Sequence, residues 1–220
     1  MTKLLPLGDQ AALAYFADEA AALRFAATVH ADNAAWLIDV VQAYASVAVF
    51  FDLDRIRYRD VAGYLHQLAE RPAGAAGSIL GRLHHIPCCY EMQLDLDRVS
   101  AHTGLATDDI IRLHTATEYT VYAIGFCPGF PYLGYLPGQL CGVPRLDQPR
   151  LRVAAGSVGL TGLQTGIYTE ERPGGWNILG RTPLELVNVA DGYFPLRVGG
   201  RVKFERIDES AYRNLEGERL

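Results

Sequence analysis

Polar side chains that can form hydrogen bonds with a ligand lie at the end of a glycine-rich segment in the second half of the chain. Residues 156–166 read GSVGLTGLQTG, with Gln164 and Thr165 at the end of the segment and Tyr168 just beyond it. Glycine-rich backbone can form a nest of N–H groups for an anion, and these side chains can orient a small amide or carboxylate. The same glycines can instead form the tight turns of a β-barrel, and the pattern leaves both interpretations open. A nucleotide-binding P-loop is excluded here because the segment has no lysine.

Two arginines in PRLDQPR, Arg145 and Arg150, each follow a proline. A guanidinium on a loop stiffened by proline is oriented for bidentate recognition of a carboxylate or phosphate. A salt bridge from either arginine to Asp147 or to another surface acid explains the pattern equally well. Arg181, in GRTP, has the same ambiguity.

Aromatic residues lie in or beside loops whose shape glycine and proline determine. Phe126, Phe130 and Tyr132 lie in GFCPGFPYLGYLPG (125–138), and Trp176 lies in RPGGWNILGRTP (172–183). Shaped loops on a rigid scaffold commonly carry binding residues. We therefore expect the functional site between residues 125 and 183, with these four aromatics in a partner interface or an apolar wall.

Several classes of chemistry lack their sequence signals. His114 fits a general base or a structural hydrogen-bonding residue, and the remaining histidines have no metal-ligand spacing. The four cysteines form no C-x-x-C pair, so neither a zinc site nor a disulfide framework is expected. The net charge of −5 gives no basic stripe for nucleic acid or membrane. We find no signal peptide and expect a cytoplasmic protein without a bound metal.

The elements that position these residues differ between the two halves of the chain. The first half predicts strands at 11–16, 36–40 and 45–51, a helix at 18–29 with Asp18 as N-cap, and a second helix that follows Asp54. A last strand near 83–88 would complete a β-α-β-β-α-β order. The first 84 residues are therefore predicted to form a ferredoxin-like α/β domain.

From residue 85 to residue 220 the pattern changes to two short helices followed by many short strands. The helices are expected at 97–103 and at 108–115 behind Thr107 as N-cap. The strands are expected at 119–124, 151–154, 157–160, 166–168, 176–179, 184–189 and 202–207. Short strands separated by glycine and proline favour a closed or sandwich-like β-structure, so the chain as a whole is predicted to be α+β.

These strings together resemble the allophanate hydrolase subunit 1 family, which includes the B-type subunit of 5-oxoprolinase and a histidine-kinase inhibitor. The resemblance is carried by GF-x-PGFPYLG (125–134), PR-x3-PR (144–150), AGSVG (155–159), QTGIY (164–168), PGGW (173–176) and GRTP (180–183), and it extends to PLGDQA (6–11), IP-x-CY (86–90) and Leu113–His114. It implies a small α/β domain followed by a cyclophilin-like β-barrel.

The resemblance also implies an activity that this chain does not perform alone. It implies a subunit of an ATP-dependent 5-oxoprolinase, which opens 5-oxoproline to glutamate with ATP and Mg²⁺ as co-substrate. The implied partners are a homologous barrel protein, the C-type subunit of 5-oxoprolinase, and a lactam-utilisation subunit. Arg145, Arg150, Gln164, Thr165, Tyr168 and His114 are the candidate substrate- or nucleotide-binding residues. Inhibition of a sensor histidine kinase and action on a urea- or allophanate-type amide are the alternatives.

Overall fold

The computed structural model describes residues 1–71 and 81–220. The chain divides into two compact units, Met1–Ile79 and Leu80–Leu220, and each is described by itself. In the part that the structure describes, no helix is long and apolar enough to cross a membrane.

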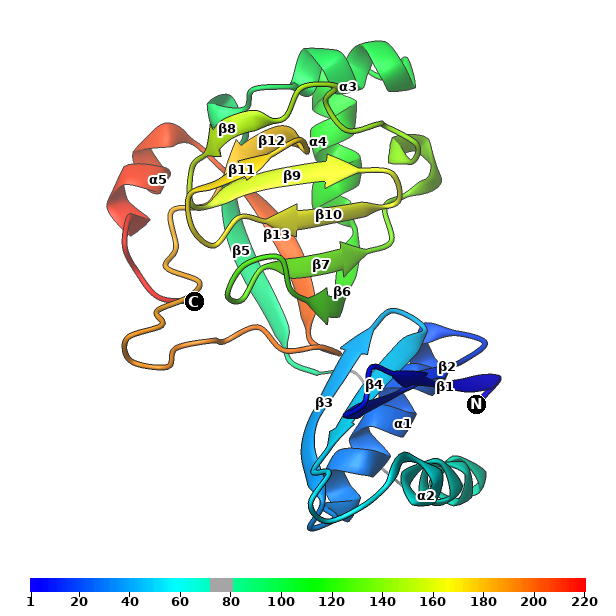
Figure 1. Cartoon of the computed structure of the whole chain (residues 1–220). Helices are drawn as coiled ribbons and strands as arrows, with labels where there is room; N and C mark the ends of the chain where they lie inside the picture. Colours follow the sequence, from blue (N-terminus) through cyan, green and yellow to red (C-terminus); the bar gives the residue numbers. More distant parts are fainter. Residues whose placement is uncertain (72–80) are drawn as a thin grey trace. The chain divides into compact units, whose positions relative to one another are not determined.

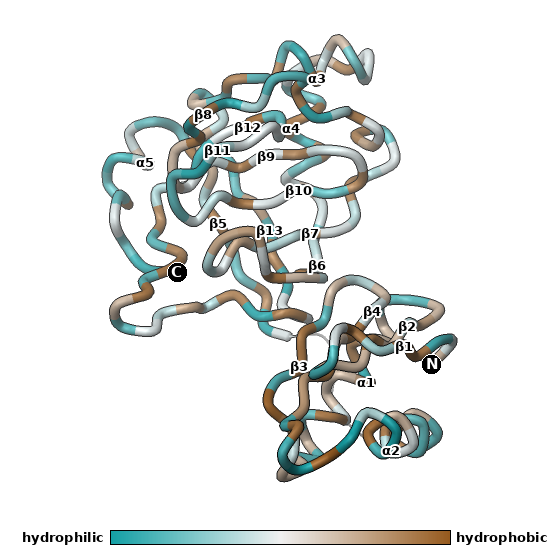
Figure 2. The backbone as a smooth tube through the Cα atoms, viewed as in Figure 1, coloured by the Kyte–Doolittle hydropathy of each residue, from teal (hydrophilic) through white to brown (hydrophobic). Residues whose placement is uncertain are grey.

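The N-terminal unit is a four-stranded antiparallel sheet with two helices on one face (Figure 1). Its elements are β1 (Lys3–Leu7), β2 (Ala11–Tyr15), α1 (Glu19–Asp32), β3 (Leu37–Ala43), β4 (Ser46–Phe51) and α2 (Tyr58–Glu70). The strand order is β1-β2-β4-β3. β3 and β4 are among the more hydrophobic stretches of this unit in Figure 2. The buried side of the sheet, with Val47, Val49 and Phe51, packs against Phe25 of α1 and Leu65 of α2.

The ferredoxin-like arrangement predicted for this unit is not confirmed. The observed order is β-β-α-β-β-α and differs from the predicted order at both ends. An additional strand at Lys3–Leu7 comes first, and the strand expected near 83–88 belongs to the second unit. That strand, β5 (Leu83–Cys89), buries Ile86 and Cys88 in the core of the barrel. Asp18 is the N-cap of α1, as predicted, whereas α2 begins at Tyr58, later than Asp54 suggests.

The C-terminal unit is a closed barrel of seven strands. They are β5, β6 (Glu118–Ile124), β7 (Pro131–Gly134), β9 (Ser157–Thr161), β10 (Gln164–Ile167), β12 (Asn177–Arg181) and β13 (Arg201–Ile207). They follow the order β6-β13-β5-β12-β9-β10-β7, and pairing between β6 and β7 closes the ring. β5 and β13 are parallel, and the other pairs are antiparallel.

Helices and a small ribbon surround the barrel. They are α3 (Leu96–Thr103), α4 (Thr107–Ala116), α5 (Glu209–Leu215), the short 3-10 helices η1 (Tyr90–Met92) and η2 (Gly138–Leu140), and the pair β8 (Arg150–Val153) and β11 (Arg172–Gly174). The predicted strand at 184–189 is wrong: only isolated bridges occur there, at Glu185 and Asn188. Thr107 is the first residue of α4 and not its N-cap.

The barrel wall has two faces that carry different residues. Side chains alternate along β10, so Thr165 and Ile167 face the interior while Gln164 and Gly166 face outward. The interior holds apolar residues of most strands, among them Leu133, Leu160 and Phe204. A second, smaller cluster lies on the outer face and contains Phe130, Tyr168, Trp176 and Ile178 with Tyr132 at its edge.

Candidate functional site

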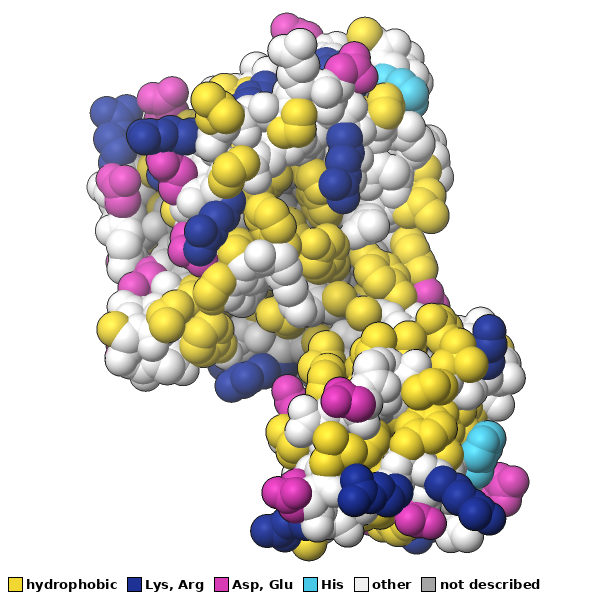
Figure 3. All heavy atoms as spheres, in the orientation of Figure 1, with side chains coloured by type: hydrophobic (Ala, Val, Ile, Leu, Met, Phe, Trp, Pro, Cys, Tyr) yellow, Lys and Arg dark blue, Asp and Glu magenta, His cyan; other side chains and the backbone are white. Residues whose placement is uncertain are grey.

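A cleft lined by aromatic side chains lies on the outer face of the barrel. It has a volume of about 240 Å³, and we call it the aromatic cleft. Its described lining residues are Phe126, Phe130, Tyr132, Arg145, Pro149, Tyr168, Pro173, Gly174, Gly175 and Trp176. Figure 3 shows hydrophobic side chains gathered over the barrel face that carries β9 and β10. The cleft thus brings together six of the residues that the sequence singled out.

The loop between β6 and β7 places two phenylalanines at the cleft. Phe126 has a positive φ of 66° and is 59% exposed, whereas Phe130 is buried. The loop is tied by backbone hydrogen bonds from Gly125 to Phe130 and from Phe130 to Cys127. Gly129 is also left-handed, with φ of 68°, so the glycine satisfies a conformation that other residues rarely adopt. Local backbone geometry therefore sets where these two rings lie.

The rings of the aromatic cleft contact each other edge to face. Phe130 has its ring centroid 5.4 Å from Tyr168 and 5.5 Å from Trp176, with interplanar angles of 83° and 88°. Edge-to-face pairs at such distances stabilise each other beyond the area they bury. The three rings therefore form a rigid wall.

Two glycines, Gly166 and Gly174, leave the space that the rings of this wall occupy. A Cβ atom on Gly166 would lie 2.8 Å from the Pro131 carbonyl oxygen and 3.0 Å from each of the Phe130 and Trp176 rings. A Cβ on Gly174 would lie 2.2 Å from the Tyr168 hydroxyl. These glycines are therefore required for close packing of the rings.

The glycine-rich segment forms a β-hairpin and not an anion nest. Gly162 and Leu163 make the two-residue turn between β9 and β10. The Gly156 N–H donates to the Tyr168 carbonyl, and the Gly162 N–H donates to the Val143 carbonyl. Of the two interpretations of this segment, the structure supports barrel turns.

Arg145 reaches the cleft from an anchored loop. The Leu146 N–H donates to the Gly175 carbonyl at 2.8 Å, and the Arg98 guanidinium donates to the Arg145 carbonyl at 3.2 Å. Across residues 1–71 and 81–220, no carboxylate forms an ion pair with the Arg145 guanidinium. The salt bridge with Asp147 that the sequence left open is therefore not observed. Arg145 is exposed and is the only charged residue among the described residues of the cleft lining.

Two tyrosines of the cleft are held in the neutral form. Burial raises the pKa of Tyr132, and the nearby Arg145 charge lowers it by a smaller amount. Burial also raises the pKa of Tyr168, against smaller opposing effects from a hydrogen bond with the Trp176 backbone and from Arg145. Both phenols therefore keep their protons at neutral pH, and each can donate a hydrogen bond.

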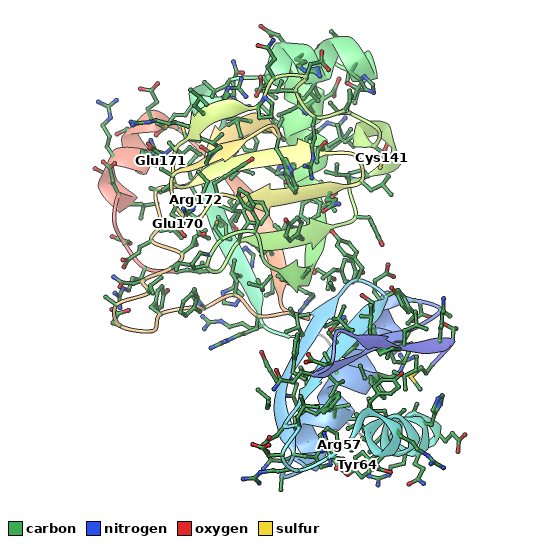
Figure 4. All side chains as sticks on the ribbon, in the orientation of Figure 1. Arg57, Tyr64, Cys141, Glu170, Glu171 and Arg172 are labelled. Carbon is green, nitrogen blue, oxygen red and sulfur yellow. The ribbon has the colours of Figure 1, made fainter. Side chains whose placement is uncertain are left out.

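Two acidic residues near the cleft, Glu170 and Glu171, lie beside other arginines. Figure 4 labels Glu170, Glu171 and Arg172, which lie together on the segment that leads into β11. Glu170 and Arg172 form an ion pair of 2.9 Å, and Glu171 lies 3.6 Å from Arg152. These acids therefore do not neutralise Arg145.

Arg150, the second arginine of PR-x3-PR, has a structural partner. It donates two hydrogen bonds to the buried Asp95 carboxylate, at 2.7 and 3.0 Å. The same carboxylate accepts the Ile178 N–H at 2.7 Å. Arg150 therefore ties β8 to the segment before α3 and to β12, and it does not line the aromatic cleft. Asp95 was not predicted, because no motif links it to an arginine so distant in the sequence.

His114 and Thr165 also lie away from the cleft, in the barrel interior. His114 is fully buried, with Nδ1 2.7 Å from the Tyr90 hydroxyl and Nε2 3.0 Å from Thr165 Oγ1. Thr165 donates its hydroxyl proton to the Gly159 carbonyl, so its oxygen accepts from His114. This assigns the proton to Nε2 and makes Nδ1 the acceptor of the Tyr90 proton. Burial lowers the pKa of His114 to about 3, so the ring is neutral and structural.

Gln164 begins β10 and lies on the outer face of the wall, but it is not among the lining residues of the cleft. Four lining residues were not predicted as site residues: Pro149, Pro173, Gly174 and Gly175. Their signal was present in the PGGW and PR-x3-PR strings, where these prolines and glycines position the chain without supplying reactive groups. No group of three or more possible metal ligands occurs in the described part of the chain.

The family of the chain is decided by a match over most of its length. A family model described as "Carboxyltransferase domain, subdomain C and D" matches residues 2–193. The chain belongs to this family.

Curated relatives agree with this membership in the carboxyltransferase C and D family. A protein of Bacillus subtilis (strain 168), named as the B-type subunit of 5-oxoprolinase, is 37% identical over 192 residues, which are 80% of this chain and 78% of that protein. A protein of Escherichia coli O157:H7 with the same name is 50% identical over 111 residues, half of each chain. The resemblance to this 5-oxoprolinase subunit and to allophanate hydrolase subunit 1 is thereby confirmed.

Solved structures of similar fold extend the comparison. The crystal structure of TTHA0988 has a TM-score of 0.78 and 33% identity, and it covers 90% of this chain. The matched region is only 40% of the TTHA0988 chain. PH0987 from Pyrococcus horikoshii is 37% identical over 96% of this chain and all of that one, with a TM-score of 0.56. The K. lactis urea amidolyase, at 16% identity and a TM-score of 0.72, shows the shared fold alone.

Proposed function

We propose that this chain is a non-autonomous subunit of an ATP-dependent 5-oxoprolinase, which opens 5-oxoproline to glutamate. Relatives that are 37% and 50% identical are named as B-type subunits of 5-oxoprolinase. The observation in this chain that carries the proposal is the aromatic cleft, whose arginine is paired with no carboxylate that the structure describes and which suits a small ring with an acidic group. The TTHA0988 chain continues well beyond the matched region, which supports further protein parts in the working enzyme.

The chemistry requires co-substrates that the assembled complex supplies. The overall reaction consumes one ATP and two waters. ATP with Mg²⁺ provides the driving force by transfer of its γ-phosphoryl group to the amide oxygen, with ADP as the leaving group; one water is added across the amide bond and the second releases the phosphoryl group as phosphate. We assign to this chain the binding and orientation of a reactant. Arg145 and Tyr168 are placed to contact it, while Phe130 and Trp176 form the wall.

The proposed partners are the C-type barrel subunit of 5-oxoprolinase and a lactam-utilisation subunit. Phe126, the most exposed ring of the cleft, is the proposed contact for a partner, because an aromatic side chain at an interface contributes strongly to binding. We also propose a cytoplasmic location, which the four free thiols support.

Subunit omission tests this function. The chain is co-expressed with its candidate partners, and 5-oxoproline-dependent ATP hydrolysis is measured with each subunit left out in turn. We expect the activity to disappear when this chain is omitted. Full activity in its absence contradicts the proposal. Co-purification of the subunits without turnover of 5-oxoproline would also contradict it and would redirect the search to a urea- or allophanate-type amide.

Inhibition of a histidine kinase is the competing function. The three rings of the aromatic wall, Phe130, Tyr168 and Trp176, are buried. Exposed aromatic surface at the cleft is therefore provided mainly by Phe126, which is a small area for contact with a helical bundle. We therefore expect no change in the autophosphorylation of a sensor kinase when the purified chain is added. Inhibition of the kinase, together with no effect of subunit omission, would favour the competing function.

A further inference from the structure

We infer that the aromatic cleft binds a compact, uncharged ring that carries one carboxylate, and that Arg145 is the residue that binds the carboxylate. The inference rests on the proposed function only for the choice of 5-oxoproline as the probe. The site itself is argued from the cleft's size, charge and contacts.

The size of the cleft limits the ligand. Its volume of about 240 Å³ is below that of most drug-sized pockets, which span roughly 300–1,000 Å³. The Phe130 and Trp176 rings stand edge to face over Gly166, so the wall cannot be compressed by moving one ring alone. A five- or six-membered ring fits such a space, whereas a purine with ribose and phosphates needs more.

The charge of the cleft limits the ligand further. Arg145 is the only charged group among the described lining residues, and one guanidinium binds one carboxylate with two parallel hydrogen bonds. A nucleotide triphosphate is commonly bound by a lysine and by a metal ion that acidic side chains hold, and these lining residues include no lysine, aspartate or glutamate. The cleft therefore takes a single negative charge, and ATP binds elsewhere in the complex.

The surroundings keep Arg145 available for that charge. Glu170 pairs with Arg172, Glu171 lies beside Arg152, and Asp95 is held by Arg150. The two phenols of the cleft are protonated, so they offer no competing anion. An arginine among aromatic rings that forms no ion pair with a described acid gains more from a ligand carboxylate than an arginine within an ion-pair network does.

The neutral phenols give the ligand a second point of recognition. Tyr168 lies at the floor of the cleft, with its hydroxyl against Gly174 and the Trp176 backbone. A protonated phenol donates to a carbonyl oxygen, which a lactam presents on the ring. A ring carboxylate with a carbonyl is thus held at its acid by Arg145 and at its carbonyl by Tyr168.

Ligand binding to the purified full-length chain, alone and in complex with its partners, tests the inference by calorimetry. The probes are 5-oxoproline, 2-pyrrolidinone, which lacks the carboxylate, cyclopentanecarboxylate, which lacks the lactam, and ATP. We expect 5-oxoproline to bind at least about tenfold more tightly than 2-pyrrolidinone, because a hydrogen-bonded charge is lost. Cyclopentanecarboxylate is expected to bind between the two, and ATP is expected not to compete with 5-oxoproline.

Two arginine variants locate the effect. Arg145→Gln is expected to weaken 5-oxoproline binding by about tenfold or more and to leave 2-pyrrolidinone binding unchanged. The matched control is Arg112→Gln, which removes an exposed arginine that pairs with Asp109 within α4, outside the cleft lining, and is expected to change neither. Equal binding of the two lactams, unchanged affinity in Arg145→Gln, competition by ATP, or no binding of 5-oxoproline to either preparation would overturn the inference.

Failure of the inference is distinguishable from failure of the proposed function. If subunit omission abolishes the oxoprolinase activity but the Arg145→Gln complex keeps its KM for 5-oxoproline, the function stands and the inference is wrong. If the cleft binds ring carboxylates through Arg145 but the activity does not depend on this chain, the inference stands and the function is wrong.

Discussion

The inner and outer faces of the barrel wall use polar side chains in opposite ways. Inside, His114 is enclosed by Tyr90 and Thr165, and both of its ring nitrogens have partners. Outside, the Arg145 guanidinium lies among aromatic rings, and no described carboxylate pairs with it. Both faces are carried by β10, whose alternate residues face the interior and the cleft. Satisfied polar groups fix the fold, and an unsatisfied charge among shaped aromatics is available for a ligand.

The two arginines of PR-x3-PR repeat this contrast within one short segment. Arg150 is bound bidentately to a buried carboxylate, whereas Arg145 is not paired with any acid that the structure describes. Each of the two arginines follows a proline, yet Arg150 stabilises the fold and Arg145 is available for binding. Substitution of Arg150 should therefore lower the stability of the fold, whereas substitution of Arg145 should lower the affinity for a ligand.

Removing the paired arginine should have the largest effect on stability. Arg150→Ala leaves the buried Asp95 carboxylate without its cation, which costs about 3 kcal/mol of the free energy of unfolding. Urea denaturation of the variant and of the wild-type chain measures this cost. A loss as small as that of an ordinary surface substitution would show that Asp95 does not depend on Arg150.

The buried histidine should make stability depend on pH. Its pKa is about 3 in the folded chain and close to 6.5 when unfolded, so the unfolded state binds more protons within that window. Stability contributed by neutral His114 is complete above pH 6.5 and falls by about 2 kcal/mol between pH 7 and pH 5.

A variant without the titrating ring isolates this effect. His114→Gln retains a donor and an acceptor for Thr165 and Tyr90 but does not titrate. Its free energy of unfolding should fall less than that of the wild type when denaturation at pH 7 is compared with denaturation at pH 5. Parallel pH profiles for the two proteins would mean that His114 is not buried in the neutral form.

Adding a methyl group at Gly166, beneath the aromatic wall, should have a moderate effect on stability. Gly166→Ala places a methyl group against the Pro131 carbonyl and the Phe130 and Trp176 rings, at a cost of about 1–2 kcal/mol. Gly138→Ala is the control, because its added Cβ has no atom within 4 Å. Thermal unfolding and tryptophan fluorescence report stability and ring packing. An unchanged Tm and spectrum in Gly166→Ala would show that the rings are not fixed.

The smallest stability effect should come from the arginine of the cleft. Arg145→Gln removes an exposed group that has no ion-pair partner among the described residues, so the free energy of unfolding should change by less than about 0.5 kcal/mol. Urea denaturation beside Arg150→Ala measures this difference directly. If both variants lose similar stability, the contrast between the two arginines is wrong.

The sequence predicted the general location of the cleft but not which of its two nearby arginines, Arg145 or Arg150, lines it. The three glycine- and proline-rich strings at 125–138, 154–168 and 172–183 contain all of its described lining residues except Arg145 and Pro149, which lie in the PR-x3-PR motif. What separates Arg145 from Arg150 is Asp95, which lies 55 residues from Arg150 and has no local pattern that marks it. Pairing decided by long-range contacts cannot be read from spacing.

Strand predictions failed where local composition and tertiary pairing disagree. β7 contains Pro131 and Gly134, which favour a turn, yet it pairs with β6 on one side and β10 on the other. β1 was missed because it contains Pro6, which is tolerated in an edge strand. Conversely, the apolar alternation at 184–189 suggests a strand, but this segment forms only isolated bridges.

The parallel pairing of β5 with β13 has a consequence for how the protein is made. The first and last strands of the barrel are neighbours, although more than a hundred residues separate them in the chain. The N-terminal unit is built from contiguous early residues, so it can form while synthesis continues. β5 must wait for β13, and its buried Ile86 and Cys88 stay without their final neighbours until β13 has been synthesised. A translational pause before β13 should therefore lower the yield of native barrel much more than a pause after it.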